Sequence, residues 1–470
     1  MSSQKGIWSI LLPIVLGIIS FVVNVYTYLT LPIYYIIQKP WKRLDIARSC
    51  GARLVKKSCL PKCVPKDRQN AEYKEYERFA EIPYHPLMEC DTISEAFELV
   101  FNELYPKDSI FQGERQILEE EIQFDTSGKA IMIDGKVLRK YKLSEYKWIT
   151  YGEMQERVNS IGNGLRALGM ETGSKVAVFS ETGINFFSFF LGIASNGGIA
   201  VTLFNTLNDD GMVFALNQTK ATIIFTTFEL LDRVSNFIYS CPHLKTVIYA
   251  EGKLNIFKFR FFVCLLNYLL FIFLGPKAVK CDINHEVRVV TLRELRKLGQ
   301  TSPWCDMPKI KIEPDWQSLI MFTSGTTGMP KGVIATNAQF KEAALALGQI
   351  VRDVIPEGPS HTYIAYLPQA HILELSIEFF LSLGGVKIGY GAPFTLNESA
   401  PGLVPGQICD LQLLKPTIMT AVPLVLDRML KEINFKLAER TPFSHAIFHH
   451  LMKYKSKWMT KGKLLYFIFN

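Results

Sequence analysis

Cysteine and histidine are scarce in this chain of 470 residues, which has nine cysteines and eight histidines. Cys59 and Cys63 are the only close cysteine pair, and no second Cys/His pair follows at zinc-ligand spacing. An odd number of scattered cysteines argues against a disulfide framework, so we expect reduced thiols in a cytosolic domain. Internal repeats and low-complexity segments are also missing. The composition, 48% hydrophobic and 20% charged, is that of an ordinary globular protein.

The chain also lacks a large excess of positive or negative residues, because the net charge of +8 is modest for this length. The positive charge is instead gathered in two groups. The first is Lys39, Lys42, Arg43, Arg48, Arg53, Lys56 and Lys57, and the second is Lys453, Lys455, Lys457, Lys461 and Lys463. The first group could bind nucleic acid, but its position beside an apolar run favours a membrane surface. We therefore expect no nucleic-acid partner, and we interpret the second group as a solvated helix face.

Charged residues are absent from Gly6 to Gln38, a stretch longer than the roughly 20 residues that cross a hydrocarbon core. The run is too long for a cleaved signal peptide, and no small-residue cleavage site is obvious. We therefore predict a membrane anchor over residues 1–38, followed by a basic juxtamembrane linker over 39–90. Because the basic cluster follows the run, the positive-inside rule leaves the rest of the chain in the cytosol. A bent hairpin within one leaflet is the alternative.

A second apolar run covers residues 261–276 and is short for a simple span. An interfacial helix, a re-entrant segment and a buried helix all fit its length and composition.

Regular patterning begins at residue 150. Thr150 and Glu153 form a capping-box pattern that opens an amphipathic helix ending near Gly169. Short apolar segments then alternate with helical segments: strands are expected over 175–180, 199–204, 222–227 and 245–250, and helices over 185–196 and 211–218. This alternation predicts an α/β domain with a largely parallel sheet covered on both faces.

The most informative stretch is residues 319–333, where an apolar strand runs into a loop rich in glycine and hydroxyl groups. Glycines let the backbone expose N–H groups to an anion, hydroxyls can donate to phosphate oxygens, and a lysine adds positive charge. A Walker loop is disfavoured because Lys331 lies between Pro330 and Gly332. The pattern therefore predicts a polyphosphate site of another kind. The loop consists of Thr323, Ser324, Gly325, Thr326, Thr327, Gly328, Met329, Pro330, Lys331 and Gly332.

This loop resembles the signature loop of the adenylate-forming superfamily, which includes acyl-CoA synthetases. The resemblance implies that the loop holds the ATP phosphates and that Thr323 lies near a magnesium ion. The implied nucleotide-binding residues are Thr323, Ser324, Gly325, Thr326, Thr327, Gly328 and Lys331. Lys331 is also an implied catalytic residue.

A second segment, residues 365–375, resembles the YLPLAHxxE segment of long-chain acyl-CoA synthetases. There the resemblance makes His371 a catalytic residue that lies beside the fatty acid carboxylate. From the residues alone we expect Pro368 to end a strand, and His371 and Glu374 to share a helix face at i, i+3. Two further segments, 389–396 and 414–423, match the same family, the second as a strand over 417–422 with a helix starting at Pro423.

The resemblance covers roughly residues 90 to 440 and implies ATP-dependent activation of a long-chain fatty acid to acyl-CoA through an acyl-adenylate. ATP, Mg²⁺ and CoA are the implied cofactor and co-substrates, and the fatty acid and a lipid membrane are the implied partners. The family's later motifs are not found, since the string G-x-T-E occurs nowhere. We therefore expect residues 91–470 to be a partial amino-terminal adenylation domain of α/β fold, without the small carboxy-terminal domain.

Two hypotheses follow from this incompleteness. The chain is either part of an active ligase or a truncated, inactive membrane protein that acts as a binding protein. In either case we expect residues 1–470 alone not to make acyl-CoA, because several groups that neutralise the α-phosphate are missing. The resemblance also implies a membrane-anchored protein with a cytosolic catalytic region, at the endoplasmic reticulum, with the lipid droplet and mitochondrial outer membrane as alternatives.

Overall fold

The computed structural model describes most of the chain in two compact units. One unit is Met1–Pro83 with Ala421–Asn470, and the other is Tyr84–Thr420. The described residues are 2–38, 52–59, 72–78, 86–125, 127–133, 136–252, 287–305, 310–323, 329–352, 361–398, 400–439 and 442–459. The second apolar run, residues 261–276, lies outside them.

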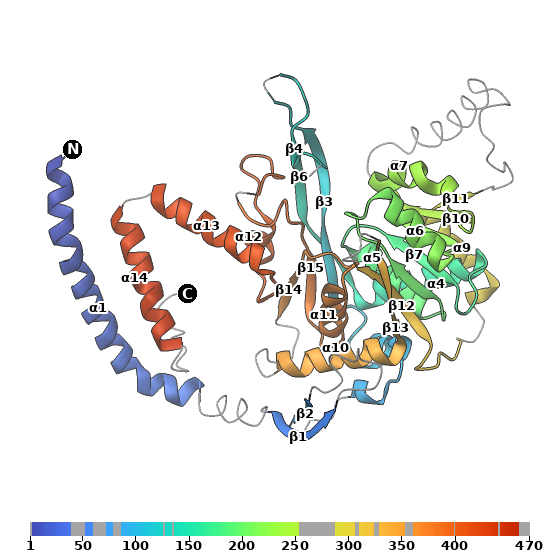
Figure 1. Ribbon diagram of the computed structural model, residues 1–470, viewed down its shortest axis with the longest axis horizontal. Coiled ribbons are helices and arrows are strands. Elements are labelled where there is room, and N and C mark those ends of the chain that lie inside the picture. The colour runs from blue at the N-terminus through green and yellow to red at the C-terminus, as the bar shows by residue number, and fades with distance from the viewer. Residues whose placement is uncertain are drawn as a thin grey trace. The chain divides into compact units, whose positions relative to one another are not determined.

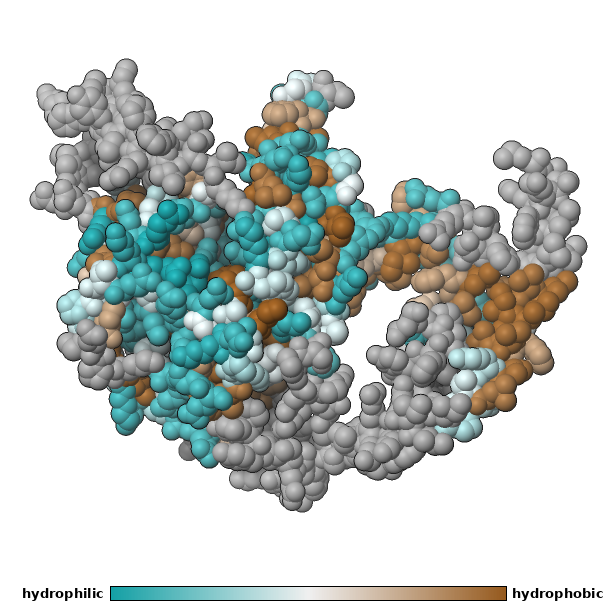
Figure 2. Space-filling view, turned by 180° about the vertical axis from the view of Figure 1, so that it is seen from behind, coloured by the Kyte–Doolittle hydropathy of each residue, from teal (hydrophilic) through white to brown (hydrophobic). Residues whose placement is uncertain are grey.

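The first unit contains the long helix α1 (Ser2–Gln38), the antiparallel pair β1 (Ala52–Cys59) and β2 (Glu72–Arg78), and the helices α13 (Pro423–Glu439) and α14 (Pro442–Met459). Within α1, the 18 residues Pro13–Thr30 are long and apolar enough to cross a membrane, with a mean hydropathy of 1.7. Large apolar side chains of this segment are exposed, and Figure 2 shows hydrophobic surface over the helix.

One side of α1 is nevertheless polar and contacts α14. Ser20 Oγ lies 2.6 Å from His450 Nε2. The Tyr454 hydroxyl donates to Asn24 Oδ1 at 2.9 Å and to Thr27 Oγ1 at 3.1 Å. The spacing of these α1 residues places them on one helix face, so α1 separates an apolar surface from a hydrogen-bonded seam.

The second unit is built on a seven-stranded sheet in the order β11-β10-β9-β7-β8-β12-β13 (Figure 1). The sheet is parallel except for β13, which runs antiparallel to β12 at one edge. The strands are β7 (Lys175–Phe179), β8 (Ile199–Thr202), β9 (Ile223–Thr227), β10 (Thr246–Ala250), β11 (Arg288–Thr291), β12 (Gln317–Thr323) and β13 (Lys331–Thr336). The predicted parallel α/β sheet is thereby confirmed, with one antiparallel edge strand that the pattern did not predict.

Both faces of this sheet are covered. Val176 and Val178 of β7 belong to one hydrophobic cluster, whereas Ala177 and Phe179 belong to the other, as strand alternation requires. Helices α4 (Tyr151–Ala167), α5 (Ile184–Ala194) and α9 (Leu292–Thr301) contribute to the first cluster, and α6 (Asp209–Thr219) and α7 (Phe228–Phe237) to the second. The capping box predicted for α4 is confirmed, since Glu153 N donates to Thr150 Oγ1 and the Glu153 carboxylate accepts from Thr150 N.

A second, five-stranded sheet has the order β16-β14-β15-β3-β6. Its strands are β3 (Ile110–Ile122), β6 (Arg139–Thr150), β14 (Thr362–Ala365), β15 (Lys387–Tyr390) and β16 (Ile418–Met419). The long antiparallel ribbon of β3 and β6 was not expected, because regular patterning in the sequence begins only at residue 150. Arg115 of β3 is buried and forms a 2.8 Å ion pair with Asp410 of α12 (Asp410–Leu414), which fixes that helix to the sheet.

Three helices join the two sheets. Helix α5 packs on β7 and β8 of the first sheet, while α11 (Ile372–Leu383) packs on β14 and β15 of the second. Helix α10 (Asn337–Arg352) contacts β12, β13 and α11. Figure 1 shows α5 and α11 in this central position. Residues from all these elements lie in one hydrophobic cluster, so the two sheets share a core.

The shared core is largely aromatic. Phe190 of α5 lies 5.5 Å from Phe340 of α10, measured between ring centroids, and Phe340 lies 5.2 Å from Phe379 of α11. Phe97 of α3 (Ile93–Leu99) lies 5.1 Å from Phe379 and 5.9 Å from Phe187 of α5. Because these rings are tilted or edge-on to one another, each contact adds to the energy of area burial.

Replacing Phe190 by alanine removes a fully buried ring that contacts α10. We expect a loss of about 3–5 kcal/mol in the free energy of unfolding, since a transfer term and a cavity term add. Denaturant unfolding checks this value. Tyr239→Ala, at a ring that is 66% exposed, is the matched control and should change stability little. Equal effects of the two substitutions would contradict the assignment of the core.

Candidate functional site

The loop singled out in the sequence connects β12 to β13. Thr323, the last residue of β12, is paired with Lys331, the first residue of β13. The Thr323 hydroxyl also lies 3.4 Å from the Lys331 carbonyl oxygen. Both side chains are exposed. Ser324, Gly325, Thr326, Thr327 and Gly328 lie outside the described residues, so the structure places only the two ends of the predicted phosphate loop, and it places them side by side.

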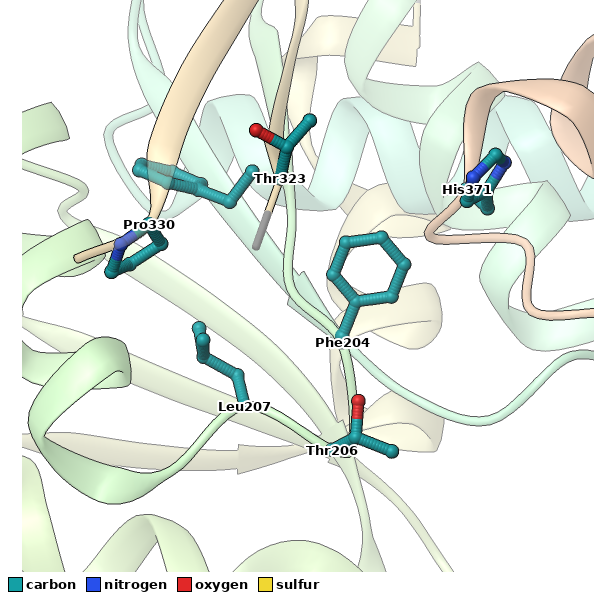
Figure 3. Close-up of a pocket in the computed structure, with 7 residues that line it drawn as sticks. Phe204, Thr206, Leu207, Thr323, Pro330 and His371 are labelled. Atoms are coloured by element: carbon teal, nitrogen blue, oxygen red, sulfur yellow. The ribbon is translucent and has the colours of Figure 1, made fainter. Parts of the chain in front are cut away.

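A cavity of about 330 Å³ lies at these loop ends. Its lining residues are Phe204, Thr206, Leu207, Phe322, Thr323, Pro330 and His371. Figure 3 shows Phe204 between Thr323 on one side and His371 on the other. Five of the seven come from the carboxyl ends of β8 and β12 or the residues just after them, which is where open parallel sheets bind ligands, whereas Pro330 precedes β13 and His371 precedes α11. Two sequence-predicted site residues, Thr323 and His371, are thus brought to one cavity from positions 48 residues apart in the chain.

His371 does not share a helix face with Glu374, and that expectation is wrong. His371 is the residue before α11, with extended backbone angles, φ −98° and ψ 134°. Its Nδ1 accepts a hydrogen bond from Leu373 N at 3.2 Å and so caps the helix. The ring also lies edge-on to Phe204, with 6.3 Å between centroids. His371 therefore borders the cavity, while Glu374 is completely buried.

The segment 367–371, which carries His371, is fixed to the first sheet by side-chain hydrogen bonds. The Thr182 hydroxyl donates to the Leu367 carbonyl at 2.8 Å and accepts from Gln369 N at 3.1 Å. Gln369 Oε1 accepts from Gly183 N at 2.8 Å. Thr202 of β8 donates to the Ala370 carbonyl at 3.2 Å. The turn before α5 and the end of β8 thus hold the segment in place.

Two buried carboxyl groups lie in the first two turns of α11. Glu374 accepts from the Tyr363 hydroxyl, with its two oxygens at 2.9 and 3.0 Å. Glu378 accepts from the Tyr390 hydroxyl at 2.9 Å and from Gln369 Nε2 at 2.6 Å. Burial raises the pKa of Glu374 and the pKa of Glu378 above the ordinary carboxyl value, because desolvation disfavours the charged form.

The described residues include no group of three His, Cys, Asp or Glu side chains placed to hold a metal ion. The exposed Thr323 hydroxyl is the predicted metal-site group that the structure places at the cavity. An Mg²⁺ ion that arrives with a polyphosphate needs few protein ligands, because it keeps several waters and binds phosphate oxygens. The side chains present are compatible with that mode of binding.

Sequence motifs assign no role to Phe204, Thr206, Leu207, Thr182 or Gln369. The first three follow β8, and the rule that ligands bind at the carboxyl ends of parallel strands could have pointed to them. Gln369 lies inside the quoted segment 365–375, but its role depends on a partner at Gly183, almost two hundred residues away. Sequence spacing carries no signal for such a contact.

Thr182→Val keeps the shape of the side chain but removes its hydroxyl, leaving the Leu367 carbonyl and the Gln369 N–H without their partner. We expect the free energy of unfolding to fall by about 1–3 kcal/mol, the cost of an unsatisfied buried polar group. Thr182→Ser keeps the hydroxyl and is the matched control. Chemical denaturation checks both variants, and a serine variant as unstable as the valine variant would show that the methyl group matters instead.

Comparison with known proteins agrees with this architecture. Residues 125–453 match the family model described as AMP-binding enzyme. The chain is 32% identical over 352 residues to long chain acyl-CoA synthetase 8 of Arabidopsis thaliana, covering 74% of this chain and 44% of that protein. It is 28% identical over 338 residues to long-chain-fatty-acid–CoA ligase 3 of Saccharomyces cerevisiae, covering 67% of this chain and 44% of that protein. The chain thus spans about half the length of the curated relatives it matches.

Two solved structures share the fold at low sequence identity. The adenylation domain of a carboxylate reductase from Mycobacterium chelonae superposes with a TM-score of 0.57 at 18% identity, covering 78% of this chain and 51% of that chain. The adenylation domain of the carboxylic acid reductase from Segniliparus rugosus, in complex with AMP and a carboxylic acid, has a TM-score of 0.57 at 17% identity, covering 76% and 53%. The chain belongs to the AMP-binding enzyme family, has an incomplete adenylate-forming α/β domain, and is a homologue of long-chain acyl-CoA synthetases.

Proposed function

We propose that the protein activates long-chain fatty acids with ATP, giving acyl-CoA through an acyl-adenylate. The observation that carries this proposal is the cavity that brings Thr323, at the end of the predicted phosphate loop, together with His371. Family membership supports the use of ATP and CoA. The printed names of the relatives support a long-chain fatty acid as the substrate.

In this proposal the hairpin end at Thr323 and Lys331 holds the ATP phosphates. The exposed Lys331 ammonium offers a positive charge, and the Thr323 hydroxyl a hydrogen-bond donor. The same resemblance assigns phosphate contacts to Ser324, Gly325, Thr326, Thr327 and Gly328. These groups would hold the pyrophosphate that is displaced when the fatty acid carboxylate attacks the α-phosphorus. This step needs positioning and charge neutralisation more than a protein nucleophile.

His371 is proposed to orient the fatty acid carboxylate at the opposite side of the cavity from the hairpin. Its Nδ1 is engaged with Leu373 N, so the ring is held in one orientation and Nε2 is the nitrogen left to contact a substrate oxygen. The apolar ring of Phe204 lies between the two groups. Magnesium bound with ATP would neutralise phosphate charge, and Thr323 is the residue proposed to contact it.

The test is an acyl-CoA synthetase assay on the full-length gene product, with ATP, Mg²⁺, CoA and labelled oleate or arachidonate. We expect AMP and acyl-CoA to form in equal amounts. Binding of ATP and fatty acid without turnover would instead identify a catalytically inactive family member that acts as a binding protein. Failure to bind either would remove the proposal.

In the full-length protein, Lys331→Ala should weaken ATP binding by roughly tenfold to a hundredfold, the value of a charge-assisted hydrogen bond. The fold should be unchanged, because Lys331 is exposed and its backbone bonds to β12 do not involve the side chain. Titration calorimetry with Mg-ATP measures the effect. Lys311→Ala, at another exposed lysine, is the control. Equal affinities for Lys331→Ala and the control would contradict the assigned role.

We also propose that α1 anchors the protein in the endoplasmic reticulum membrane, with the catalytic region in the cytosol. The exposed apolar side chains of Pro13–Thr30 support this proposal, together with the basic residues that follow the helix in the sequence.

Charges placed on the apolar side of α1 should release the protein from membranes. Phe21 and Leu29 are 68% and 71% exposed, and each aspartate in a hydrocarbon layer costs about 2.5–3.5 kcal/mol. The double variant Phe21→Asp and Leu29→Asp should therefore float less with liposomes in a density gradient. Tyr239→Asp, in the other unit, is the control. Unchanged flotation of the double variant would show that another segment holds the membrane.

A further inference from the structure

The carboxyl groups of Glu374 and Glu378 form an unusual pair. They are one helical turn apart on α11, both are 0% exposed, and they lie within hydrogen-bonding reach of each other. No Lys, Arg or His forms an ion pair with either carboxyl in the part of the chain that the structure describes. Two ionised carboxylates in such surroundings would repel each other at low dielectric, so the pair needs another source of stability.

The hydrogen bonds of Glu378 identify that source of stability. Glu378 Oε2 accepts from both Tyr390 and Gln369, but Glu378 Oε1 is buried without a donor among the described residues. A proton on this oxygen removes the orphan acceptor and gives a donor for the Glu374 carboxylate. Glu374 then accepts from Glu378 and from Tyr363, and every polar atom of the pair has a partner.

The groups that face the pair do not offer a compensating positive charge. Tyr363 comes from β14, Tyr390 from β15, and Tyr366 from the segment after β14, and all three are neutral phenols. Glu114 of β3 adds a further negative charge near Tyr390. This setting favours one retained proton over two negative charges.

The pair is connected to the cavity through Gln369. That side chain donates to Glu378 with Nε2 and accepts from Gly183 N with Oε1. Its main chain is bonded to Thr182, and it lies two residues before His371. A change in the charge of Glu378 therefore acts directly on the segment that sets the position of His371.

We propose that Glu374 and Glu378 are positioning residues that share one proton, and that this proton keeps the segment 367–371, and with it His371, in place at the cavity. The inference concerns the same site as the proposed function, and it rests on that function only for what His371 contacts. When the shared proton is lost, the pair carries two buried negative charges, and their repulsion and desolvation favour an opening that admits water to the carboxyl groups and loosens the segment 367–371 attached to them through Gln369.

The direction of the pH effect follows from linkage. The folded protein holds a proton that an unfolded chain releases at the ordinary carboxyl pKa, so the contribution of the pair to stability is complete at low pH. It falls as the pH rises above the ordinary carboxyl pKa, and it is lost as the pH passes the folded pKa of Glu378, which burial raises well above its ordinary value. Between these two pKa values, an opening of the segment 367–371 that requires loss of the proton becomes about tenfold more frequent per pH unit.

Hydrogen–deuterium exchange of the peptide that contains residues 367–371, measured by mass spectrometry between pH 6 and 8, tests the proposal on the full-length protein without substrate. In the wild type we expect exchange of this peptide to accelerate about tenfold per pH unit beyond the intrinsic base-catalysed increase. Glu378→Gln keeps a donor toward Glu374 and an acceptor for Tyr390 but cannot ionise, so this additional dependence should vanish. Glu171→Gln, which removes an exposed carboxyl, should behave as the wild type.

A second measurement covers the case in which Glu378→Gln does not fold. The infrared absorption of the wild type at pH 7.5 should contain the band of a protonated carboxyl group, and Glu374→Gln should change that band. The proposal is overturned if the wild type lacks the band, or if Glu378→Gln keeps the wild-type pH dependence of exchange. A protein that shows no acyl-CoA formation but passes both tests would contradict the proposed function and leave this inference intact.

Discussion

The burial of α5 on all sides is the constraint on which the rest of the second unit depends. Its four phenylalanines, Phe186, Phe187, Phe189 and Phe190, are each 0% exposed, so no side of the helix faces water. Phe189 stacks on Phe225 of the first sheet, while Phe190 contacts α10 and Phe187 contacts Phe97 of α3. A helix that is hydrophobic all round is buried either in the core of a large protein or in a membrane, and α5 is surrounded by other elements of its own unit. The two sheets therefore depend on each other, because neither alone could cover this helix.

The geometry of the candidate site follows from that central layer. Gly183, just before α5, donates its N–H to Gln369 Oε1, and Thr202, at the end of the strand that follows α5, donates its hydroxyl to the Ala370 carbonyl. The segment with His371 is thus fixed by the first sheet, although its flanking elements, β14 and α11, belong to the second. The cavity lies where these hydrogen bonds connect the two sheets, which explains why residues distant in the sequence meet there. The packing of α5 between the two sheets therefore both stabilises the core and aligns the residues of the site.

Local rules predicted the parts of the fold that local chemistry determines. The capping box at Thr150 and the strand–helix alternation after residue 175 were correct because caps and apolar periods act over a few residues. The ribbon of β3 and β6 was missed because its outer half is exposed on both faces, as at Glu119–Glu121, and so has no apolar alternation. For the site, the sequence predicted Thr323 and His371, and the structure brings both to one cavity. The sequence could not predict the capping role of His371 or the hydrogen bond between Glu378 and Gln369, because both depend on the folded structure.

The antiparallel strand β13 has a consequence for self-association. It is the last strand in its sheet, and Val333 and Ile334 are 55% and 51% exposed. Among the described residues, no strand pairs with its outer side, so a row of backbone donors and acceptors faces outward beside apolar side chains. Such an edge is a template for adding a strand from another chain. Concentrated solutions of residues 1–470 are therefore prone to grow by edge-to-edge pairing at β13, next to the lysine that begins this strand.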